Sequence, residues 1–319
     1  MTVLGEFELI AKYFADAAGG RGDVALGVGD DAALVRVPPG RELVVCADTI
    51  VSGVHFPAGT EARAVGHRAL AINLSDLAAM GAQPAWFTLA LTLPRSEEAW
   101  VREFAQGLLA LAREFQIALV GGDTTSGPLS VTVQAMGFCA PGAALLRSGA
   151  RTGDAVFVSG APGEAAAGLA LLQRTTGASS DRDALVERFL YPHPRVALGQ
   201  ALVGVASAAI DVSDGTLADL GKLLQASGAG ARIDPEALLV SPALRRMQDR
   251  QSALRWAASG GDDYELCFTV PEAKVPLARE IESVLMLPLT RIGTVEAERG
   301  LRSSDGAPLP AAGFDHFAD

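Results

Sequence analysis

AIDVSDGTLADL, residues 209–220, holds a complete strand, turn and helix start. The apolar run 208–212 predicts a buried strand, and residues 216–226 predict a helix that Gly228 closes. Ser213, Asp214 and Gly215 stand between the two. Backbone amides at a helix start attract anions, and Asp214 could hold a cation that touches the same anion. A simple helix cap by Ser213 or Asp214 explains these residues equally well.

Aspartate beside glycine, at the end of an apolar run, recurs along the chain. The residues concerned are Asp30, Asp31, Asp48, Asp76, Asp123, Asp211, Asp214, Asp262 and Asp263. A strand that stops at an aspartate places a carboxylate at the sheet edge, so we expect these side chains to converge. Mg²⁺ joins a few carboxylates to substrate phosphates, and paired like charges favour a compensating cation. The pattern indicates a magnesium-dependent enzyme acting on phosphates, although each aspartate alone is typical of a turn.

The composition narrows the class of partner. The chain has 319 residues, 49% of them hydrophobic, and a net charge of -11. This charge argues against non-specific nucleic-acid binding and against an anionic membrane surface. It is compatible with phosphate binding through metal ions that lie between the two negative partners. Lysine occurs only at Lys12, Lys222 and Lys274, so we expect phosphate contacts from arginine or from metal.

The cysteines and the N-terminal segment indicate the compartment. Cys46, Cys139 and Cys267 are far apart and flanked by apolar residues, which is typical of reduced, buried thiols. Charged residues interrupt the apolar pattern of the first 20 residues, which therefore lacks the apolar region of a signal peptide. No stretch approaches the length of a transmembrane helix. We expect a cytoplasmic protein.

Apolar spacing predicts the remaining elements. Helices are expected at 6–17, 67–80, 97–114, 163–174 and from about 195, and strands at 42–47, 116–120, 130–138, 155–159, 265–270 and 290–295. The segment 121–123 is predicted to be a turn. Strands and helices mix without a clean βαβ alternation, which favours an α+β fold. The small, polar segment 147–154 marks a boundary, so we predict domains at 1–146 and 147–319.

The usual nucleotide and hydrolase motifs do not occur in the sequence. It lacks the P-loop G-x-x-x-x-G-K-[ST], a helix-opening G-x-G-x-x-G and the G-x-S-x-G nucleophile elbow. ATP would therefore bind on another scaffold. Arg147 and Arg151 flank the predicted boundary, where ligands often bind, although Arg151 fits a solvated surface position better. His55 either contacts a substrate phosphate or caps a loop.

Ten blocks of the sequence, in order from near the N-terminus to the end, resemble the thiamine-monophosphate kinase family. They are GDDAALV, ADTIVSGVHF, NLSDLAAMGAQP, LALTLP, GGDTTSGPLSVTV, RSGARTGD, YPHPRVALG, AIDVSDGTLADL, SGGDDYELCF and GFDHF. NLSDLAAMGA and GGDTT are shared, in looser form, with aminoimidazole ribonucleotide synthetase and selenophosphate synthetase. GGDDYEL and the terminal DHF are more specific to the kinase.

The resemblance implies a fold and a reaction. The fold is the two-domain α+β fold of the synthetase superfamily, with an N-terminal mixed-sheet domain that binds metal and nucleotide and forms a homodimer, and a C-terminal α+β domain. The reaction is direct, in-line transfer of the γ-phosphoryl group of ATP to thiamine monophosphate, assisted by several Mg²⁺ ions. The attacking phosphate is already ionised at neutral pH, because its second pKa is about 6, so no protein base is needed.

The resemblance also assigns individual residues. For Mg²⁺ these are Asp30 or Asp31, Asp48, Asp76, Asp123, Asp211 and Asp214. For ATP they are Gly122, Asp123, Arg147 and Ser213, and for the thiamine phosphate His55, Asp262 and Phe314. Catalysis is assigned to Asp123, Asp214 and Arg147, with Arg147 adding a charge-assisted hydrogen bond.

The sequence departs from the family pattern at two places. Cys46 and Ala47 replace the common Ser-Thr, which leaves only backbone carbonyls as ligands there. Asp262 replaces the commoner Glu, and its shorter side chain passes the contact with substrate to Asp263 or to a water. Two alternatives stay open: another ATP-dependent enzyme of the superfamily with a different acceptor, or a non-catalytic protein that binds Mg-ATP without turnover.

Overall fold

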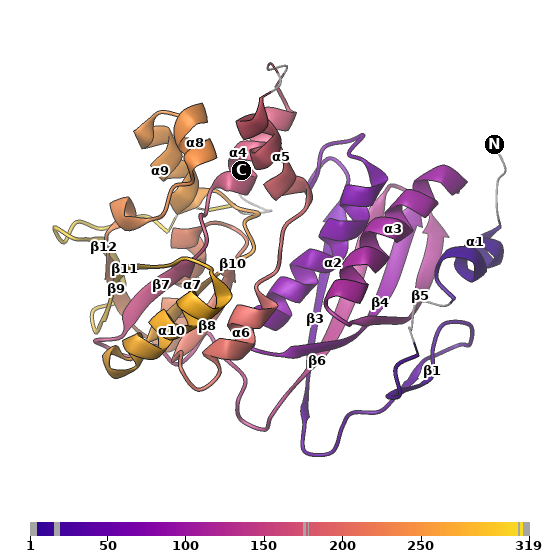
Figure 1. Ribbon diagram of the computed structural model, residues 1–319, viewed down its shortest axis with the longest axis horizontal. Coiled ribbons are helices and arrows are strands. Elements are labelled where there is room, and N and C mark those ends of the chain that lie inside the picture. The colour runs from indigo at the N-terminus through magenta and orange to yellow at the C-terminus, as the bar shows by residue number, and fades with distance from the viewer. Residues whose placement is uncertain (1–4, 16–19, 175–176, 178, 312, 315–319) are drawn as a thin grey trace. The chain divides into compact units, whose positions relative to one another are not determined.

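The computed structural model describes residues 5–15, 20–174, 177, 179–311 and 313–314 (Figure 1). They form two compact units, each with its own sheet: residues 1–77 with 82–142, and residues 78–81 with 143–319. The terminal DHF block and the end of the predicted helix at 6–17 lie outside the described residues. The expectation of an α+β fold is confirmed, because each unit combines helices with a mixed sheet.

The first unit is a four-stranded sheet with helices on one side. Its helices are α1 (Glu6–Tyr13), α2 (Ala62–Ala79) and α3 (Glu98–Glu114), and its strands are β1 (Val24–Leu26), β2 (Leu34–Val35), β3 (Glu42–Val51), β4 (Gln83–Leu93), β5 (Ala118–Ser126) and β6 (Ser130–Cys139). The sheet order is β3-β6-β4-β5, with β4 and β5 parallel and the other pairs antiparallel. β1 and β2 form a separate hairpin.

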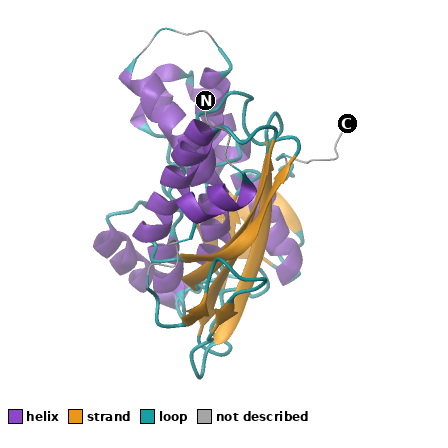
Figure 2. Cartoon of the chain, turned by 90° about the vertical axis from the view of Figure 1, so that its right-hand side faces the viewer, coloured by secondary structure: helices purple, strands orange, loops and turns teal. Residues whose placement is uncertain are grey.

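Among the described residues of this unit, the helices cover one face of the sheet (Figure 1). Figure 2 shows the long, twisted strands with most of the helices to their left. Along β3, alternate side chains turn inward and outward, as the two-residue period of a strand requires. Leu43 and Val45 are 44% and 48% exposed on the outward side. Large apolar residues on an open sheet face are typical of an association surface.

The second unit is built on a six-stranded sheet. Its strands are β7 (Ala155–Ser159), β8 (Ala208–Val212), β9 (Gly230–Ile233), β10 (Glu265–Val270), β11 (Leu289–Glu296) and β12 (Gly300–Ser303), in the order β12-β9-β11-β7-β10-β8. The helices are α4 (Glu164–Leu172), α5 (Ser180–Leu190), α6 (Val196–Leu202), α7 (Thr216–Ser227), α8 (Pro242–Met247), α9 (Arg250–Ser259) and α10 (Val275–Leu285), with short 3₁₀ turns η1 (Pro235–Ala237) and η2 (Glu272–Lys274).

Three neighbouring strands of this sheet, β7, β10 and the edge strand β8, are buried on both faces. Every residue of β7, β8 and β10 is buried, which explains why these strands appear in the sequence as unbroken apolar runs. Their predicted bounds are confirmed. The α7 helix ends at Gly228 in a left-handed conformation, also as predicted, because glycine adopts positive φ without a steric penalty.

The predicted turn at 121–123 is wrong, because β5 continues through it. The strand has an irregular register against β4 at this point. Gly122 has φ 153°, and a Cβ there would lie 1.9 Å from the carbonyl oxygen of Leu89. Glycine is therefore needed for a close approach of two strands and not for a reversal of the chain.

Two further observations bear on the environment of the protein. No helix among the described residues is both long and apolar enough to cross a membrane. All three cysteines are free thiols, with Cys139 and Cys267 buried and Cys46 half-buried.

Candidate active site

The turn between β8 and α7 is organised by a buried carboxylate, Asp219. Its Oδ2 accepts hydrogen bonds from the backbone amides of Ser213, Asp214 and Gly215 at 2.9, 2.9 and 3.2 Å. Asp219 lies in the first turn of α7 and is 1% exposed. A negative charge is favoured in the first turn of a helix. The three amides at this helix start are therefore already bound to an anion, and that anion belongs to the chain itself.

This arrangement corrects both expectations for the turn. The predicted anion site at the amides of 213–215 is wrong, because Asp219 occupies it. The alternative, a cap by Ser213 or Asp214, is also wrong, since the N-cap residue is Gly215 and no side chain caps the helix from that position. Asp219 was missed because it lies within the helix, three residues beyond its first residue.

Lys222 bridges the side chains of Asp214 and Asp219. Its ammonium group donates to Asp214 Oδ2 and, at 2.8 Å, to Asp219 Oδ1. Burial raises the pKa of Asp219, whereas the bond from Lys222 opposes that rise. Burial lowers the pKa of Lys222, but its two carboxylate partners outweigh this and raise it overall. One of the three lysines of the chain is thus placed against a candidate metal ligand.

The loop between α9 and β10 is tied to the same turn. The amide of Asp262 donates to the carbonyl of Ser213 at 2.8 Å, and the amide of Tyr264 donates to the carbonyl of Val212 at 2.9 Å. Asp262 and Tyr264 both have positive φ, 68° and 52°, which is uncommon for residues with a side chain and marks stored backbone strain. The Tyr264 hydroxyl donates to Asp262 Oδ1 at 3.2 Å. The backbone of Asp262 is thereby held at Ser213, and its carboxylate is held by Tyr264.

Phe314 joins these residues from the end of the chain. Its amide donates to the carbonyl of Asp214 at 3.2 Å, and its side chain is 57% exposed. A cavity of about 800 Å³ opens here, and its lining includes Asp214, Lys222, Arg299 and Phe314. The structure therefore brings together Ser213, Asp214, Asp262 and Phe314, four residues that are separated by up to a hundred positions in the sequence.

Asp263 has a structural role instead of a substrate contact. It is 2% exposed, and its two oxygens accept the amides of Gly163 at 2.6 Å and Ala165 at 3.2 Å, at the start of α4. Burial raises its pKa to about 8, while these amides act in the opposite direction. The expectation that Asp263 replaces Asp262 at the substrate is wrong, because both oxygens of Asp263 are used inside the unit.

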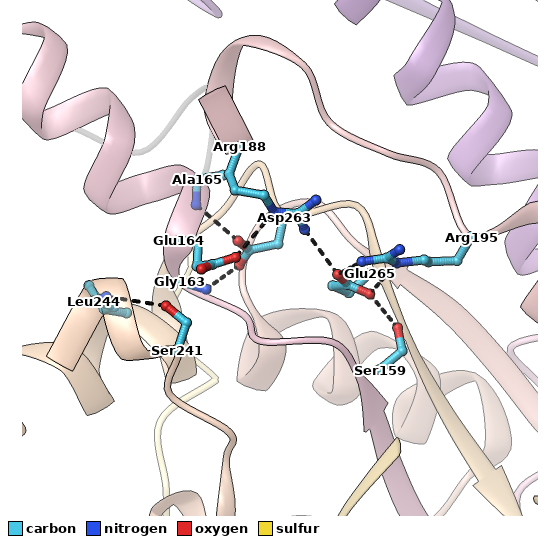
Figure 3. A network of polar contacts seen from close by, with 10 residues as sticks. All are labelled: Ser159, Gly163, Glu164, Ala165, Arg188, Arg195, Ser241, Leu244, Asp263 and Glu265. Atoms are coloured by element: carbon cyan, nitrogen blue, oxygen red, sulfur yellow. Dashed lines mark hydrogen bonds and ion pairs between the residues drawn. The ribbon is translucent and has the colours of Figure 1, made fainter. Parts of the chain in front are cut away.

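Glu265, two residues further on, forms the buried centre of an ion-pair network (Figure 3). It accepts from Arg195 Nε at 2.7 Å, from Arg188 Nη2 at 3.0 Å and from the Ser159 hydroxyl at 2.6 Å. Burial raises the pKa of Glu265, but the two arginines outweigh it and the pKa is lowered. Figure 3 shows Arg188 between Glu164 and Glu265, with an ion pair to each. The network fixes the first residue of β10, the strand that follows the Asp262 loop.

In the first unit, Asp48 and Asp76 form a carboxylate pair. The side chain of Asp48 interacts with that of Asp76, and burial raises the pKa of Asp48 against the opposing effects of Asp76 and His55. Asn73 supports the pair, since its Oδ1 accepts the amide of Asp48 at 3.2 Å and its Nδ2 donates to the carbonyl of Ala69 at 3.0 Å. Two carboxylates facing each other on β3 and α2 favour a bound cation.

Cys46 and His55 lie beside this pair. The Cys46 thiol contacts the carbonyl of Asn73 at 3.4 Å, and burial raises its pKa, so it is a thiol and not a thiolate ligand. His55 Nδ1 accepts the amide of Val51 at 3.0 Å. In a neutral imidazole this leaves Nε2 as the nitrogen that bears the proton, which is the form that donates to a phosphate oxygen.

Asp123 lies far from Asp48 within the chain. The register aligns Asp48 with Val133, Leu89 and Gly122. It aligns Asp123 with Ala90, Thr132 and Thr49. Neighbours along a strand face opposite sides, so Asp48 faces α2 while Asp123 faces the open side. β3 and β5 are the two sheet edges, about 14 Å apart at the usual strand spacing.

The prediction that the aspartates lie at strand ends and converge is therefore only partly correct. Asp48, Asp123 and Asp211 all lie inside strands. Asp211 is 6% exposed. Asp30 and Asp31 are exposed in the loop between β1 and β2, and Asp30 Oδ1 accepts the amide of Asp31 at 2.8 Å. That loop approaches β5, because Val28, Gly122 and Asp123 line one small cavity.

Arg147 lies at the other end of α7 from Ser213 and Asp214. The Ser227 hydroxyl, at the last residue of this helix, donates to the carbonyl of Arg147 at 2.8 Å. Twelve helical residues span about 18 Å, so the exposed Arg147 side chain is not in the cluster around the turn. Its assignment to ATP stays a prediction.

The donor set of both units fits Mg²⁺ that is also bound by phosphate. Among the described residues, no three His, Cys, Asp or Glu side chains are grouped as a metal site would group them. The structure instead offers one carboxylate pair, Asp48 with Asp76, and the single carboxylate of Asp214 at the cavity. Mg²⁺ typically takes one or two carboxylates and completes its six ligands with water and substrate phosphates, so both places suit the ion.

Comparisons with known proteins cover almost the whole chain. Models described as the N-terminal and C-terminal domains of AIR synthase related proteins match residues 29–139 and 151–306. Thiamine-monophosphate kinase of Salmonella typhimurium is 49% identical over 320 residues, 98% of each chain. The crystal structure of the Stenotrophomonas maltophilia K279a thiamine-monophosphate kinase is 46% identical, with a TM-score of 0.89 over 94% of this chain and 97% of that chain.

A further solved structure contains ligands. It is described as AaThiL complexed with AMPPCP and TMP, is 32% identical to this chain, and has a TM-score of 0.80 over 99% of both chains. The identity, the coverage and the shared fold agree with one another. The chain therefore belongs to the thiamine-monophosphate kinase family, within the AIR synthase related proteins.

Proposed function

We propose that the protein transfers the γ-phosphoryl group of ATP to the phosphate of thiamine monophosphate, which yields thiamine diphosphate and ADP. The observation that supports this most is the set of backbone hydrogen bonds that brings Ser213, Asp214, Asp262 and Phe314 together. Two of these residues, Asp214 and Phe314, line a cavity of about 800 Å³. A relative at 32% identity binds AMPPCP and TMP together. The cavity combines the carboxylate of Asp214 with the exposed ring of Phe314, which suits an acceptor that carries both a metal-bound phosphate and a ring system.

The main obstacle to this reaction is repulsion between two polyanions. Mg²⁺ would neutralise the transferring phosphoryl group and hold both phosphates. In this chain Asp48, Asp76 and Asp214 would bind it, with Asp30, Asp31, Asp123 and Asp211 as further candidates. The attacking oxygen needs no base at neutral pH. His55 would donate from Nε2 to the acceptor phosphate, and Phe314 would pack against a thiamine ring.

We assign the ATP contacts to Gly122, Asp123, Ser213 and Arg147. Residues 1–146 would supply the metal and nucleotide contacts of the first domain, and residues 147–319 those of the second. Since backbone amides of the 213–215 turn are bound to Asp219, Ser213 would contact the nucleotide through its hydroxyl or carbonyl. Arg147 would add a charge-assisted hydrogen bond.

We further propose that the active form is a homodimer built through the open face of the four-stranded sheet. Leu43 and Val45 are exposed there, and Asp123 points to the same side. Asp48 and Asp123 of one chain face opposite sides of the sheet, so a metal ion that used both would take them from two copies. The free thiols of the three cysteines fit a reducing compartment such as the cytoplasm.

The experiment that tests this proposal is direct product formation. Purified protein with ATP, MgCl₂ and thiamine monophosphate is expected to release thiamine diphosphate and ADP in equal amounts. EDTA is expected to stop the reaction, and free thiamine is expected to give no product. ATP binding without thiamine diphosphate formation would contradict the proposed acceptor, and turnover in EDTA would contradict the role of the metal.

A further inference from the structure

We propose that Asp219 is a positioning residue of the active site, which fixes Ser213 and Asp214 for nucleotide and metal, and that Lys222 is the resident cation of Asp214. The proposal rests on the proposed role of Asp214 as a metal ligand. Neither Asp219 nor Lys222 is needed to bind substrate in the scheme above. Both act through the residues that do.

The geometry of Asp219 is that of an internal substitute for a bound anion. One carboxylate oxygen accepts three consecutive amides, those of residues 213–215. Such concave sets of amides commonly hold a phosphate or another anion. At 1% exposure, Asp219 loses little of this interaction to water. The turn is therefore set before any ligand arrives, and the direction of the Asp214 side chain is set with it.

Gly215 makes this compact turn possible. Its φ is 128°, and a Cβ at this position would lie 2.9 Å from the carbonyl group of Ser259, just before the Asp262 loop. The amide of Asp262 then binds the carbonyl of Ser213. Asp219 thus acts on two adjoining segments, because the turn that it holds is the surface on which the Asp262 loop rests.

Lys222 gives the arrangement its charge balance. Its ammonium group bridges Asp214 and Asp219, so one positive charge serves two carboxylates. A divalent ion that binds Asp214 must displace this ammonium group or tolerate its repulsion. Asp219 remains 2.8 Å from Lys222 Nζ and is the partner that keeps the displaced lysine close. Asp219 and Lys222 are therefore expected to change metal affinity in opposite directions.

The test is binding of Mn²⁺ alone to the nucleotide-free protein, followed by electron paramagnetic resonance. Asp219→Asn keeps the shape of the side chain but lacks its charge, and we expect it to weaken Mn²⁺ binding about tenfold or more, the range for residues that orient metal ligands. Lys222→Met is expected to tighten Mn²⁺ binding a few-fold, because a competing charge is removed. Unchanged affinity in Asp219→Asn, or weaker binding in Lys222→Met, would overturn the proposal.

Asp154→Asn is the matched control. Asp154 is also a buried carboxylate of the second unit, 5% exposed, and holds a turn by accepting the amide of Arg151 at 2.9 Å and the Ser207 hydroxyl at 2.6 Å. Asp154→Asn is expected to lower stability without changing Mn²⁺ affinity. If it weakens Mn²⁺ binding as much as Asp219→Asn does, the effect is general loss of structure and the positioning role is refuted.

A small carboxylate offers a second, independent readout. Asp219→Ala leaves the three amides of the turn without their anion, and formate is small enough to replace it. We expect formate to restore Mn²⁺ affinity in Asp219→Ala and to have no effect on the wild-type protein or on Asp154→Ala. In turnover, the same variant is expected to need more Mg²⁺ for half-maximal rate, a change that a smaller folded fraction alone cannot produce. Failure of formate to restore affinity in folded Asp219→Ala would count against the proposal.

Asp214→Asn separates this inference from the proposed function. If Asp214→Asn leaves Mn²⁺ binding unchanged, Asp214 is not a metal ligand and the proposed function loses that assignment. If Asp214→Asn weakens binding while Asp219→Asn does not, the proposed function stands and only the positioning role fails.

Discussion

Single carboxylates in this chain differ in role according to what binds their oxygens. Asp219 and Asp263 are buried and accept backbone amides, so they hold the chain in shape. Asp214 and Asp262 are half-buried, and Asp214 lines the cavity. Adjacent aspartates, as at Asp262 and Asp263, therefore do not both belong to the site. Both residues lie in the loop before β10, where Asp262 has φ 68° and only Asp263 has both oxygens bound to backbone amides.

At this scale, Asp214→Asn is expected to lower kcat by about 10² or more, the order found when a group that stabilises transition-state charge is removed. The fold should be retained, because the amide is isosteric and the turn is held by Asp219. The measurement is steady-state thiamine diphosphate formation, with circular dichroism to confirm folding. Asp234→Asn, at the N-cap of η1, is the control and should keep full activity.

Gly122 supports a second prediction about one residue. Replacing it by alanine places Cβ 1.9 Å from the Leu89 carbonyl at φ 153°, so Gly122→Ala is expected to destabilise the first unit by at least about 2 kcal/mol. Gly121→Ala is a matched control, because a Cβ there meets no atom within 4 Å. Denaturant unfolding of both variants is the measurement, and equal stability of the two would contradict the close approach of β4 and β5.

Secondary-structure elements are joined at one place by a buried ion-pair network. Glu265 at the start of β10 binds Arg188 of α5, Arg195 at the N-cap of α6 and Ser159 at the end of β7. Breaking one partner of a buried pair leaves the other charges uncompensated, at a cost of about 3 to 5 kcal/mol. The network therefore links four elements of the second unit and has a structural role.

The pH dependence of the unfolding free energy tests the contribution of the Glu265 ion pairs. The pKa of Glu265 is lowered in the folded protein from 4.5, so its stabilising effect is present above about pH 4.5 and is lost as the pH falls through the lower folded value. Glu265→Gln is expected to lose most of this stabilisation at pH 7. Its difference from the wild type should shrink below pH 4.5.

Urea unfolding of both proteins between pH 7 and pH 4 measures this difference. Glu236→Gln removes an exposed ion pair with Arg250 and is the control, since such pairs contribute little. A difference between Glu265→Gln and the wild type that stays constant with pH would contradict the charged state of Glu265.

The accuracy of the predicted helices and strands depended mainly on how deeply each element is buried. β7, β8 and β10 have correct bounds because burial on both faces produces unbroken apolar runs. The strand β4 was not predicted, because it begins with the exposed Gln83 and with Pro84, two residues that are more typical of a loop. The short helices α8 and α9 were also missed, since their pattern is too polar and too brief to give a helical period.

The elements around the candidate site were predicted better than the contacts between its residues. The motif around Ser213 and Asp214 indicated a strand, a turn and a helix, and the structure confirms these elements. The role of Asp219 could not be predicted, because it depends on the distance between one carboxylate and three amides. The i,i+3 spacing of Asp219 and Lys222 is a signal that could have indicated their ion pair.

For the whole molecule, the open sheet face is the feature that predicts assembly. Val45→Glu places a charge in the middle of the proposed dimer contact, so we expect a shift toward monomer with loss of activity. Sedimentation velocity measures the assembly state. Val284→Glu is the control, because Val284 is 78% exposed on α10 in the second unit. Dimers that persist in Val45→Glu would place the contact on another surface.

The buried thiols make it possible to follow the unfolding of each unit separately. Cys139 ends β6 in the first unit, and Cys267 lies within β10 in the second, 6% and 0% exposed. Burial raises the pKa of both, so neither reacts while its strand is paired. A thiol-labelling reagent therefore reaches each one only when its own sheet opens. The order in which the two cysteines are modified, read by peptide mass, gives the order in which the two units open.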